Sequence, residues 1–214
     1  MSPRTGPQID LVTRESYTEC VIVRTGTFAR LRPEPGTKVL VFGDIHGDLA
    51  SLEAGLALVE DGDTLVFLGD YADRGPHGVE VIERIDDLVH SRRDRVVALL
   101  GNHEVYSKDG RPSFRPCTLV SEATDKRGSW AAFFKRFSSF VSQLSLAALL
   151  PGAALFVHGG VGPECTSAEV FAHPSQSVFD DVLWSDPGAK RGRHPSRRGI
   201  GHVFGIDVSR RVIE

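Results

Sequence analysis

Short apolar runs that stop at a polar motif alternate with segments of helical periodicity over most of the chain. Between the runs, apolar residues spaced by three or four predict helices that begin after Asp48, near residue 79 and at residue 130, the last reaching residue 150. Strands that alternate with helices indicate an α/β domain whose sheet is largely parallel and covered on both faces. The apolar runs predicted as strands are KVLVFGD (38–44), TLVFLGD (64–70), RVVALL (95–100) and ALFVHGG (154–160).

Three segments of the chain lack this alternation of apolar runs and helical periodicity. Residues 1–37 are polar and interrupted by proline and glycine, which predicts an N-terminal arm or loop with one candidate edge strand in YTECVIVRTG (17–26). Residues 107–127 have no clear period and predict a long connection, and the part after residue 182 is more β-like. We therefore expect one domain over residues 38–214, preceded by the arm.

Composition narrows the class of protein. The chain has 214 residues, of which 41% are hydrophobic and 25% charged, with a formal net charge of −3. These values are typical of a globular protein and give no reason to expect nucleic-acid binding. The three cysteines, Cys20, Cys117 and Cys165, are far apart and lack metal-site spacing, which suits a reducing compartment. No run approaches the roughly 18 apolar residues of a membrane span, so we expect a cytoplasmic protein; its oligomeric state is left open.

Each predicted strand ends in a polar motif, and the four motifs are GDIHG, GDYADRG, GNHE and HGG. Open α/β sheets bind ligands at the carboxyl ends of their strands, so these motifs are expected to meet in one crevice. A single aspartate after a strand is commonly only a helix N-cap, and a single histidine is commonly structural. Four such motifs together favour a functional site. Its candidate residues are Asp44, His46, Asp70, Asp73, Arg74, Asn102, His103 and His158.

Carboxylate, amide and imidazole ligands without thiolate suit manganese, iron or zinc. The inventory is large enough for two divalent ions, and a carboxylate such as Asp70 can bridge them. Two ions about 3.5–4 Å apart hold a hydroxide between them and stabilise displacement at phosphorus. Arg74 adds a planar fork of donors for phosphate oxygens. The residues therefore predict metal-assisted phosphoester hydrolysis.

The motif order, continued by VLWSDP (182–187) and RGIGHVFG (198–205), resembles the phosphoprotein-phosphatase family of Ser/Thr phosphatases, within the calcineurin-like metallophosphoesterases. The resemblance covers about residues 38–208. The compact linkers and the RGPHG sequence in and after GDYADRG look more like bacterial or archaeal members. It implies a central mixed β-sandwich flanked by helices. It also implies hydrolysis of phosphoserine or phosphothreonine in proteins by a metal-bridging hydroxide, with two ions, manganese first and iron or zinc as alternatives.

The resemblance also assigns roles to individual residues. His103 matches the acid that protonates the leaving alkoxide, and Asp73 matches the carboxylate that orients it. Arg74 and Arg198 match two phosphate clamps. The metal ligands implied by the resemblance are Asp44 and His46 for the first ion, Asp70 for both, and Asn102 and His158 for the second.

The sequence departs from the family pattern at its end. Family members continue to a further histidine in an R-G-H or R-A-H context, whereas this sequence stops at SRRVIE. We expect the second ion to have three protein ligands and weaker binding, with His194 or His202 as alternative substitutes, and an apolar sheet edge to be exposed.

Two other functions remain open from the sequence: a symmetrical diadenosine tetraphosphatase or related nucleotide pyrophosphatase, and a catalytically weak binding or regulatory protein. The basic run KRGRHPSRR (190–198) is interpreted as a solvated loop that carries Arg198 to the phosphate, in preference to a nucleic-acid or targeting signal.

Overall fold

The structure, a computed structural model, describes residues 21–213 in two compact units. The first twenty residues of the predicted arm, Cys20 among them, lie outside the described residues. The unit that holds residues 33–145 is called the central unit, and the unit that holds residues 23–32 and 146–213 is called the C-terminal unit. None of the helices in this part of the chain is both long enough and apolar enough to cross a membrane.

The central unit is built on a parallel three-stranded sheet. Its strands are β3 (Val39–Phe42), β4 (Thr64–Phe67) and β5 (Val96–Ala98), in the order β3-β4-β5, with Val39 opposite Thr64 and Leu65 opposite Val96. The middle strand β4 is buried along its whole length, as its uninterrupted apolar sequence predicts. Edge strand β3 is only half-buried, although its sequence predicts a buried strand. The first three predicted strands are thus confirmed.

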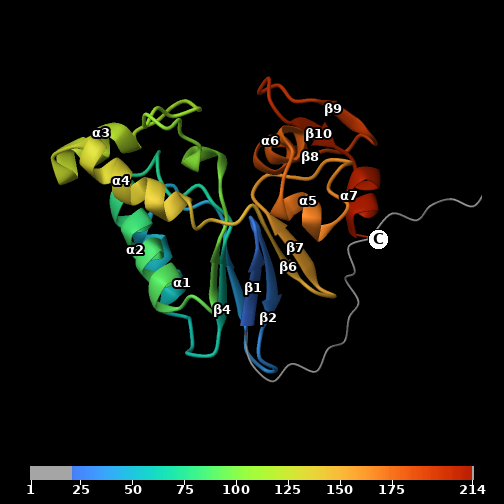
Figure 1. The fold of residues 1–214 in the computed structure, drawn as a ribbon, viewed down its shortest axis with the longest axis horizontal. Coiled ribbons are helices and arrows are strands. Elements are labelled where there is room, and N and C mark those ends of the chain that lie inside the picture. The colour runs from blue at the N-terminus through green and yellow to red at the C-terminus, as the bar shows by residue number, and fades with distance from the viewer. Residues whose placement is uncertain (1–20, 214) are drawn as a thin grey trace, which may run out of the picture. The chain divides into compact units, whose positions relative to one another are not determined.

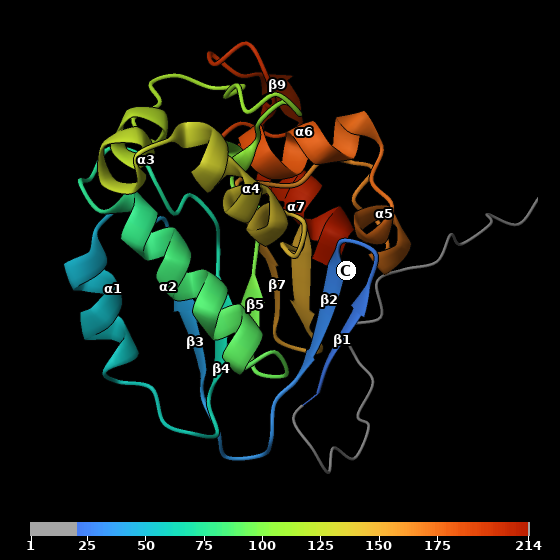
Figure 2. The ribbon, with the colours of Figure 1, turned by 60° about the vertical axis from the view of Figure 1, so that its left-hand side comes forward.

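Four helices gather on one side of this sheet (Figures 1 and 2). Asp48 accepts the backbone N–H of Ser51 at 3.0 Å, which confirms the predicted N-cap of the first helix. The second helix places its predicted apolar face in the core, with Val79, Ile82 and Ile85 fully buried. The helices are α1 (Leu49–Leu56), α2 (Gly78–Ser91), α3 (Leu119–Arg127) and α4 (Trp130–Val141), and a 3₁₀ turn, η1, spans Asn102–Glu104.

Two predictions for the second half of the central unit are wrong. Residues 107–127, predicted as a connection, contain α3, whose weak apolar face buries only Leu119 and Ala123 and so produced no period to detect. The predicted helix over 130–150 ends at Val141, because the leucine- and alanine-rich run after it forms a strand. A short apolar run without clear periodicity fits either element, and tertiary pairing decides between them.

The C-terminal unit contains a mixed four-stranded sheet in the order β1-β2-β6-β7. Strand β6 pairs in parallel with β2 and antiparallel with β7. The strand that carries HGG therefore belongs to a different sheet from the other three motif strands, which corrects the prediction of one sheet. Strand β1 lies at an edge of this sheet, as predicted for the candidate edge strand within residues 17–26. Strand β2 was not predicted. The strands are β1 (Val21–Thr25), β2 (Phe28–Arg32), β6 (Ala147–Leu150) and β7 (Ala154–Val157).

A second, smaller sheet of the C-terminal unit has the order β8-β10-β9. The β-like texture after residue 182 is correct only in part, because Val182–Trp184 end a helix and Ile206 begins another. The strands are β8 (Asp186–Pro187), β9 (Arg193–Pro195) and β10 (His202–Phe204), and the helices are α5 (Ala168–Ala172), α6 (Gln176–Trp184) and α7 (Ile206–Ile213).

Replacing Phe137 by Ala tests the packing of the central unit. Phe137 is 1% exposed and contacts the rings of Phe133 and Tyr106, so the substitution leaves a cavity. We expect the free energy of unfolding to fall by about 3–5 kcal/mol, measured by urea denaturation. Lys135→Ala, at an exposed position of the same helix, should change it by less than about 0.5 kcal/mol. Equal losses in the two variants would contradict this account of the core.

Candidate metal centre and catalytic residues

The loops that follow β3 and β4 are joined backbone to backbone. The N–H groups of Ile45 and His46 both donate to the carbonyl of Asp70, at 3.1 and 2.9 Å, and the N–H of Gly75 donates to the carbonyl of His46 at 2.8 Å. A Cβ on Gly75 would lie 2.4 Å from that same carbonyl oxygen, which explains why glycine occupies this position. The two loops therefore hold each other in place and position the side chains of both motifs.

Four predicted site residues share an unusual backbone conformation. Within residues 21–213, the non-glycine residues with positive φ are His46 (47°), Asp70 (54°), Asp73 (67°) and Arg74 (65°). Each such residue costs on the order of 1–3 kcal/mol and persists only where the surroundings enforce it. Strain of this kind gathers at functional sites, so the backbone itself marks the same residues that the motifs select.

The imidazole of His46 faces the carboxylate of Asp70 in an arrangement that calls for a cation. His46 Nδ1 lies 2.8 Å from the carbonyl oxygen of Ala72, and donation there leaves the lone pair of the neutral ring on Nε2. Nε2 is buried, has no hydrogen-bond partner among the described residues, and lies 3.3 Å from Asp70 Oδ2. Two acceptors that face each other repel unless a proton or a metal ion lies between them. The residues therefore fit a divalent ion.

His103 completes the cluster. Its Nε2 lies 4.0 Å from Asp70 Oδ2, and the three candidate ligand atoms of His46, Asp70 and His103 lie within 4.8 Å of one another. Asp70 is itself held in place, because its Oδ1 accepts the backbone N–H of His103 at 3.0 Å. Asp44 lies at the margin, with Oδ2 3.9 Å from His46 Nε2 and about half of its side chain exposed. Asn102 is buried in η1 beside His103.

The ring of His103 is oriented by Asp73. His103 Nδ1 lies 2.8 Å from Asp73 Oδ2, and the other carboxylate oxygen accepts the backbone N–H groups of Thr118 and Leu119. Burial raises the pKa of Asp73, but the hydrogen bonds from His103, Leu119 and Thr118 outweigh it and hold that pKa below its usual value. The carboxylate stays ionised and fixes the ring, so that Nε2 points to Asp70.

Arg74 follows Asp73 directly in the chain. Its side chain is exposed and forms no ion pair among the described residues, so its guanidinium is available for an anion.

His158 and Arg198 belong to the C-terminal unit. His158 follows β7 and is half-buried, and the N–H of Gly159 next to it donates to Val182 at 2.7 Å. Arg198 is exposed, with Nη2 3.3 Å from Asp186. The role of His158 as a metal ligand and that of Arg198 as a phosphate clamp stay predictions.

The two histidines considered as substitute ligands make other contacts in the C-terminal unit. His202 Nδ1 lies 3.1 Å from the buried carboxylate of Asp181, and His194 Nε2 lies 2.8 Å from the carbonyl oxygen of Arg191.

Sequence reasoning missed the role of Glu104. Its side chain is 1% exposed and accepts three backbone N–H groups, those of Asp70 (2.8 Å), Tyr71 (3.0 Å) and Gly101 (3.0 Å). Burial and the charge of Asp70 raise the pKa of this carboxyl to about 8. Glu104 lies inside the GNHE motif, but only the fold shows that its side chain ties the loop after β4 to the loop after β5.

A buried histidine–carboxylate pair beside an oxygen- and nitrogen-lined metal position is the arrangement of a metal-dependent hydrolase site. In agreement, the chain matches the model of the calcineurin-like phosphoesterase family over residues 37–214, and it belongs to that family. The fold class predicted from the sequence is confirmed.

Two known proteins refine this comparison. The chain is 33% identical over 189 residues to a protein phosphatase 2A catalytic subunit of Dictyostelium discoideum, covering 82% of this chain and 58% of that protein. A solved Saccharomyces cerevisiae protein serine/threonine phosphatase, described as similar to human phosphatase PP5, superposes with a TM-score of 0.71 at 28% identity, covering 84% of this chain and 57% of that one. The chain thus spans a little over half the length of these relatives, and the predicted resemblance to Ser/Thr phosphatases is confirmed.

Exchanging Glu104 for Gln tests the link between the loops. The amide would turn a donor toward one of three backbone N–H groups, so we expect a loss of about 1–3 kcal/mol in the free energy of unfolding. We also expect manganese to bind about tenfold more weakly, measured by isothermal titration calorimetry. Glu60→Gln, at an exposed surface pair, should leave both quantities nearly unchanged. Wild-type metal affinity in Glu104→Gln would contradict the proposed link.

Proposed function

We propose that this protein is cytoplasmic and hydrolyses phosphomonoesters, and that its substrates are phosphoserine and phosphothreonine residues of proteins. The observation that carries the proposal is that two groups of side chains lie next to each other in the central unit. One is an unpartnered imidazole nitrogen of His46 facing Asp70, and the other is the His103–Asp73 pair 4.0 Å from the same carboxylate. In this proposal the first group binds metal and the second donates a proton to the leaving group.

The proposed ligand set for a pair of divalent ions, manganese in the first instance, keeps the residues assigned from the motifs. His46 and Asp70 are supported by their geometry, and Asp44 by its position 3.9 Å from His46 Nε2. Asn102 and His158 complete the proposed set. Such ions, when bound, polarise the phosphoryl oxygens and lower the pKa of water so that it can attack phosphorus.

His103 is proposed as the proton donor to the leaving group. With Nδ1 bonded to Asp73, the ring presents Nε2 toward Asp70, which supports a role in protonating a phosphate ester bound there. A serine alkoxide is a poor leaving group, so protonation as the bond breaks lowers the barrier. Asp73 acts through His103 by keeping it oriented. Arg74 and Arg198 are proposed to bind the non-bridging phosphate oxygens through their planar guanidinium groups.

Replacing His103 by Asn separates the roles of acid and ligand. If His103 is the acid, kcat for a phosphoserine peptide should fall by about 10²–10⁴-fold, while bound manganese per chain stays at the wild-type value. The loss should be smaller for p-nitrophenyl phosphate, because p-nitrophenolate leaves readily without a proton.

His46→Gln is the matched comparison, since it should lose metal as well as activity. Loss of manganese from His103→Asn, measured by elemental analysis after gel filtration, would make His103 a ligand instead.

A substrate panel tests the reaction class. In added manganese, the wild-type chain should hydrolyse a phosphoserine peptide and p-nitrophenyl phosphate faster than diadenosine tetraphosphate. Turnover is followed by phosphate release and, for the dinucleotide, by chromatography. Cleavage of the dinucleotide alone would overturn the proposal in favour of a nucleotide hydrolase, and no turnover of any substrate would favour a binding role.

A further inference from the structure

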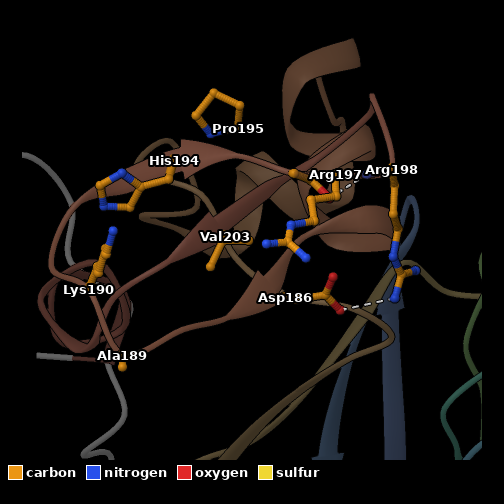
Figure 3. Close-up of a pocket in the computed structure, with 9 residues that line it drawn as sticks. Asp186, Ala189, Lys190, His194, Pro195, Arg197, Arg198 and Val203 are labelled. Atoms are coloured by element: carbon orange, nitrogen blue, oxygen red, sulfur yellow. Dashed lines mark hydrogen bonds and ion pairs between the residues drawn. The ribbon is translucent and has the colours of Figure 1, made fainter.

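A basic cavity of about 440 Å³ lies within the small sheet of the C-terminal unit (Figure 3). Its walls come from β8 and the segment after it, from β9 and the β9–β10 connection, and from β10. Lys190 and His194 lie on one side, Arg197 and Arg198 on the other, with Val203 between them. These basic residues belong to the run KRGRHPSRR (190–198), which the sequence analysis interpreted as a solvated loop.

The cavity carries an excess of positive charge that its own residues leave unneutralised. Of its side chains, Asp186 is the one carboxylate, and it pairs with Arg198 at 3.3 Å. Lys190 and Arg197 are exposed and make no ion pair within residues 21–213. The whole chain has a formal net charge of −3, so this concentration of cations is local. Two cationic groups thus face the hollow without a partner.

The frame around the cavity is held by partly buried contacts. Arg193 of β9 donates to both oxygens of the buried Asp181, at 2.9 and 2.8 Å. The N–H of Gly192 donates to the carboxylate of Asp207 at 2.9 Å, and the N–H of Gly188 donates to Phe204 at 2.8 Å. These contacts fix both ends of the segment between β8 and β9, which carries Lys190, and a wall that is already in place lowers the entropic cost of binding an anion.

We propose that this cavity binds an acidic side chain of the polypeptide substrate, next to the phosphorylated residue. The step rests on the proposed function, because Arg198 lines the cavity and is also the proposed phosphate clamp. The guanidinium of Arg197 and the ammonium of Lys190 are suited to a carboxylate or a second phosphate. The protein would therefore prefer phosphopeptides with aspartate, glutamate or another phosphoserine near the target residue.

The lining favours a peptide over a nucleic acid. Single-stranded nucleic acids bind along extended basic grooves in which aromatic side chains stack on the bases. Among the described residues that line this cavity there is no Phe, Tyr or Trp, His194 carries its one aromatic ring, and Val203 and Pro195 give it an apolar portion.

The test compares phosphoserine peptides of one length whose neighbours on either side are neutral, glutamate, phosphoserine or lysine. For the wild-type chain, kcat/KM should be about 3- to 10-fold higher for the glutamate and phosphoserine peptides than for the neutral one, a size expected for partly exposed ion pairs. The lysine peptide should be the poorest substrate, and the preference should shrink as salt is added.

The double variant Lys190→Glu/Arg197→Glu should remove or reverse this preference and leave kcat/KM for p-nitrophenyl phosphate unchanged. Lys135→Glu/Arg210→Glu makes the same charge change at exposed positions of α4 and α7, and it should keep the preference. An unchanged preference in the first variant, or an equal loss in both, would overturn the proposal.

Direct binding separates failure of the cavity from failure of the proposed reaction. Fluorescence anisotropy of an unphosphorylated glutamate-rich peptide should show binding to the wild-type chain and about 3- to 10-fold weaker binding to Lys190→Glu/Arg197→Glu. This result would support the cavity even if no phosphoester is hydrolysed. Equal affinity for both chains, or tighter and variant-sensitive binding of a single-stranded oligonucleotide, would refute the acidic-peptide proposal.

Discussion

The site depends on one buried carboxylate, that of Glu104, which holds the loops after β4 and β5 together. It accepts three backbone N–H groups, two from the loop that carries Asp70 and one from Gly101. Burying a charge is costly, and the pKa of this carboxyl, raised to about 8 by burial and by Asp70, reflects that cost. Divalent cations at Asp70 would offset the repulsion between the two carboxylates. The same contacts that shape the metal site thus become more favourable when metal is bound, which couples the site to the stability of the central unit.

The second constraint is backbone strain. His46, Asp70, Asp73 and Arg74 all adopt the left-handed conformation, at a cost on the order of 1–3 kcal/mol each. The core formed by β4, β5 and helices α1 to α4 must supply the opposing stability, because it contains a large cluster of buried apolar side chains. In many enzymes, as here, a well-packed scaffold holds strained residues in positions that the reaction needs. On our proposal, charge around the small sheet of the C-terminal unit adds a preference for acidic substrates to the phosphatase reaction.

The sequence was most informative where local pattern and chemistry coincide. Uninterrupted apolar runs located β3, β4, β5 and β7, and the motifs after the first three selected the residues that the structure gathers around Asp70. It failed where long-range pairing decides the outcome. Nothing local distinguishes the leucine-rich strand β6 from a continued helix, and nothing local places β7 in another sheet. The role of Glu104 was also hidden, since its partners lie up to 34 residues away along the chain. The strained backbone at Asp70 and Asp73 could not be anticipated from residue type, because positive φ is usually adopted by glycine.

The central claim is that His46 and Asp70 hold a divalent ion beside a proton-donating His103. The most direct measurement is a crystal structure of the chain grown with manganese, with anomalous scattering used to locate the ions. The account predicts an anomalous peak between His46 Nε2 and Asp70 Oδ2, at coordination distances of about 2.0–2.3 Å, with His103 Nδ1 still bonded to Asp73. The absence of a peak there, or a proton-mediated His46–Asp70 hydrogen bond in its place, would contradict it.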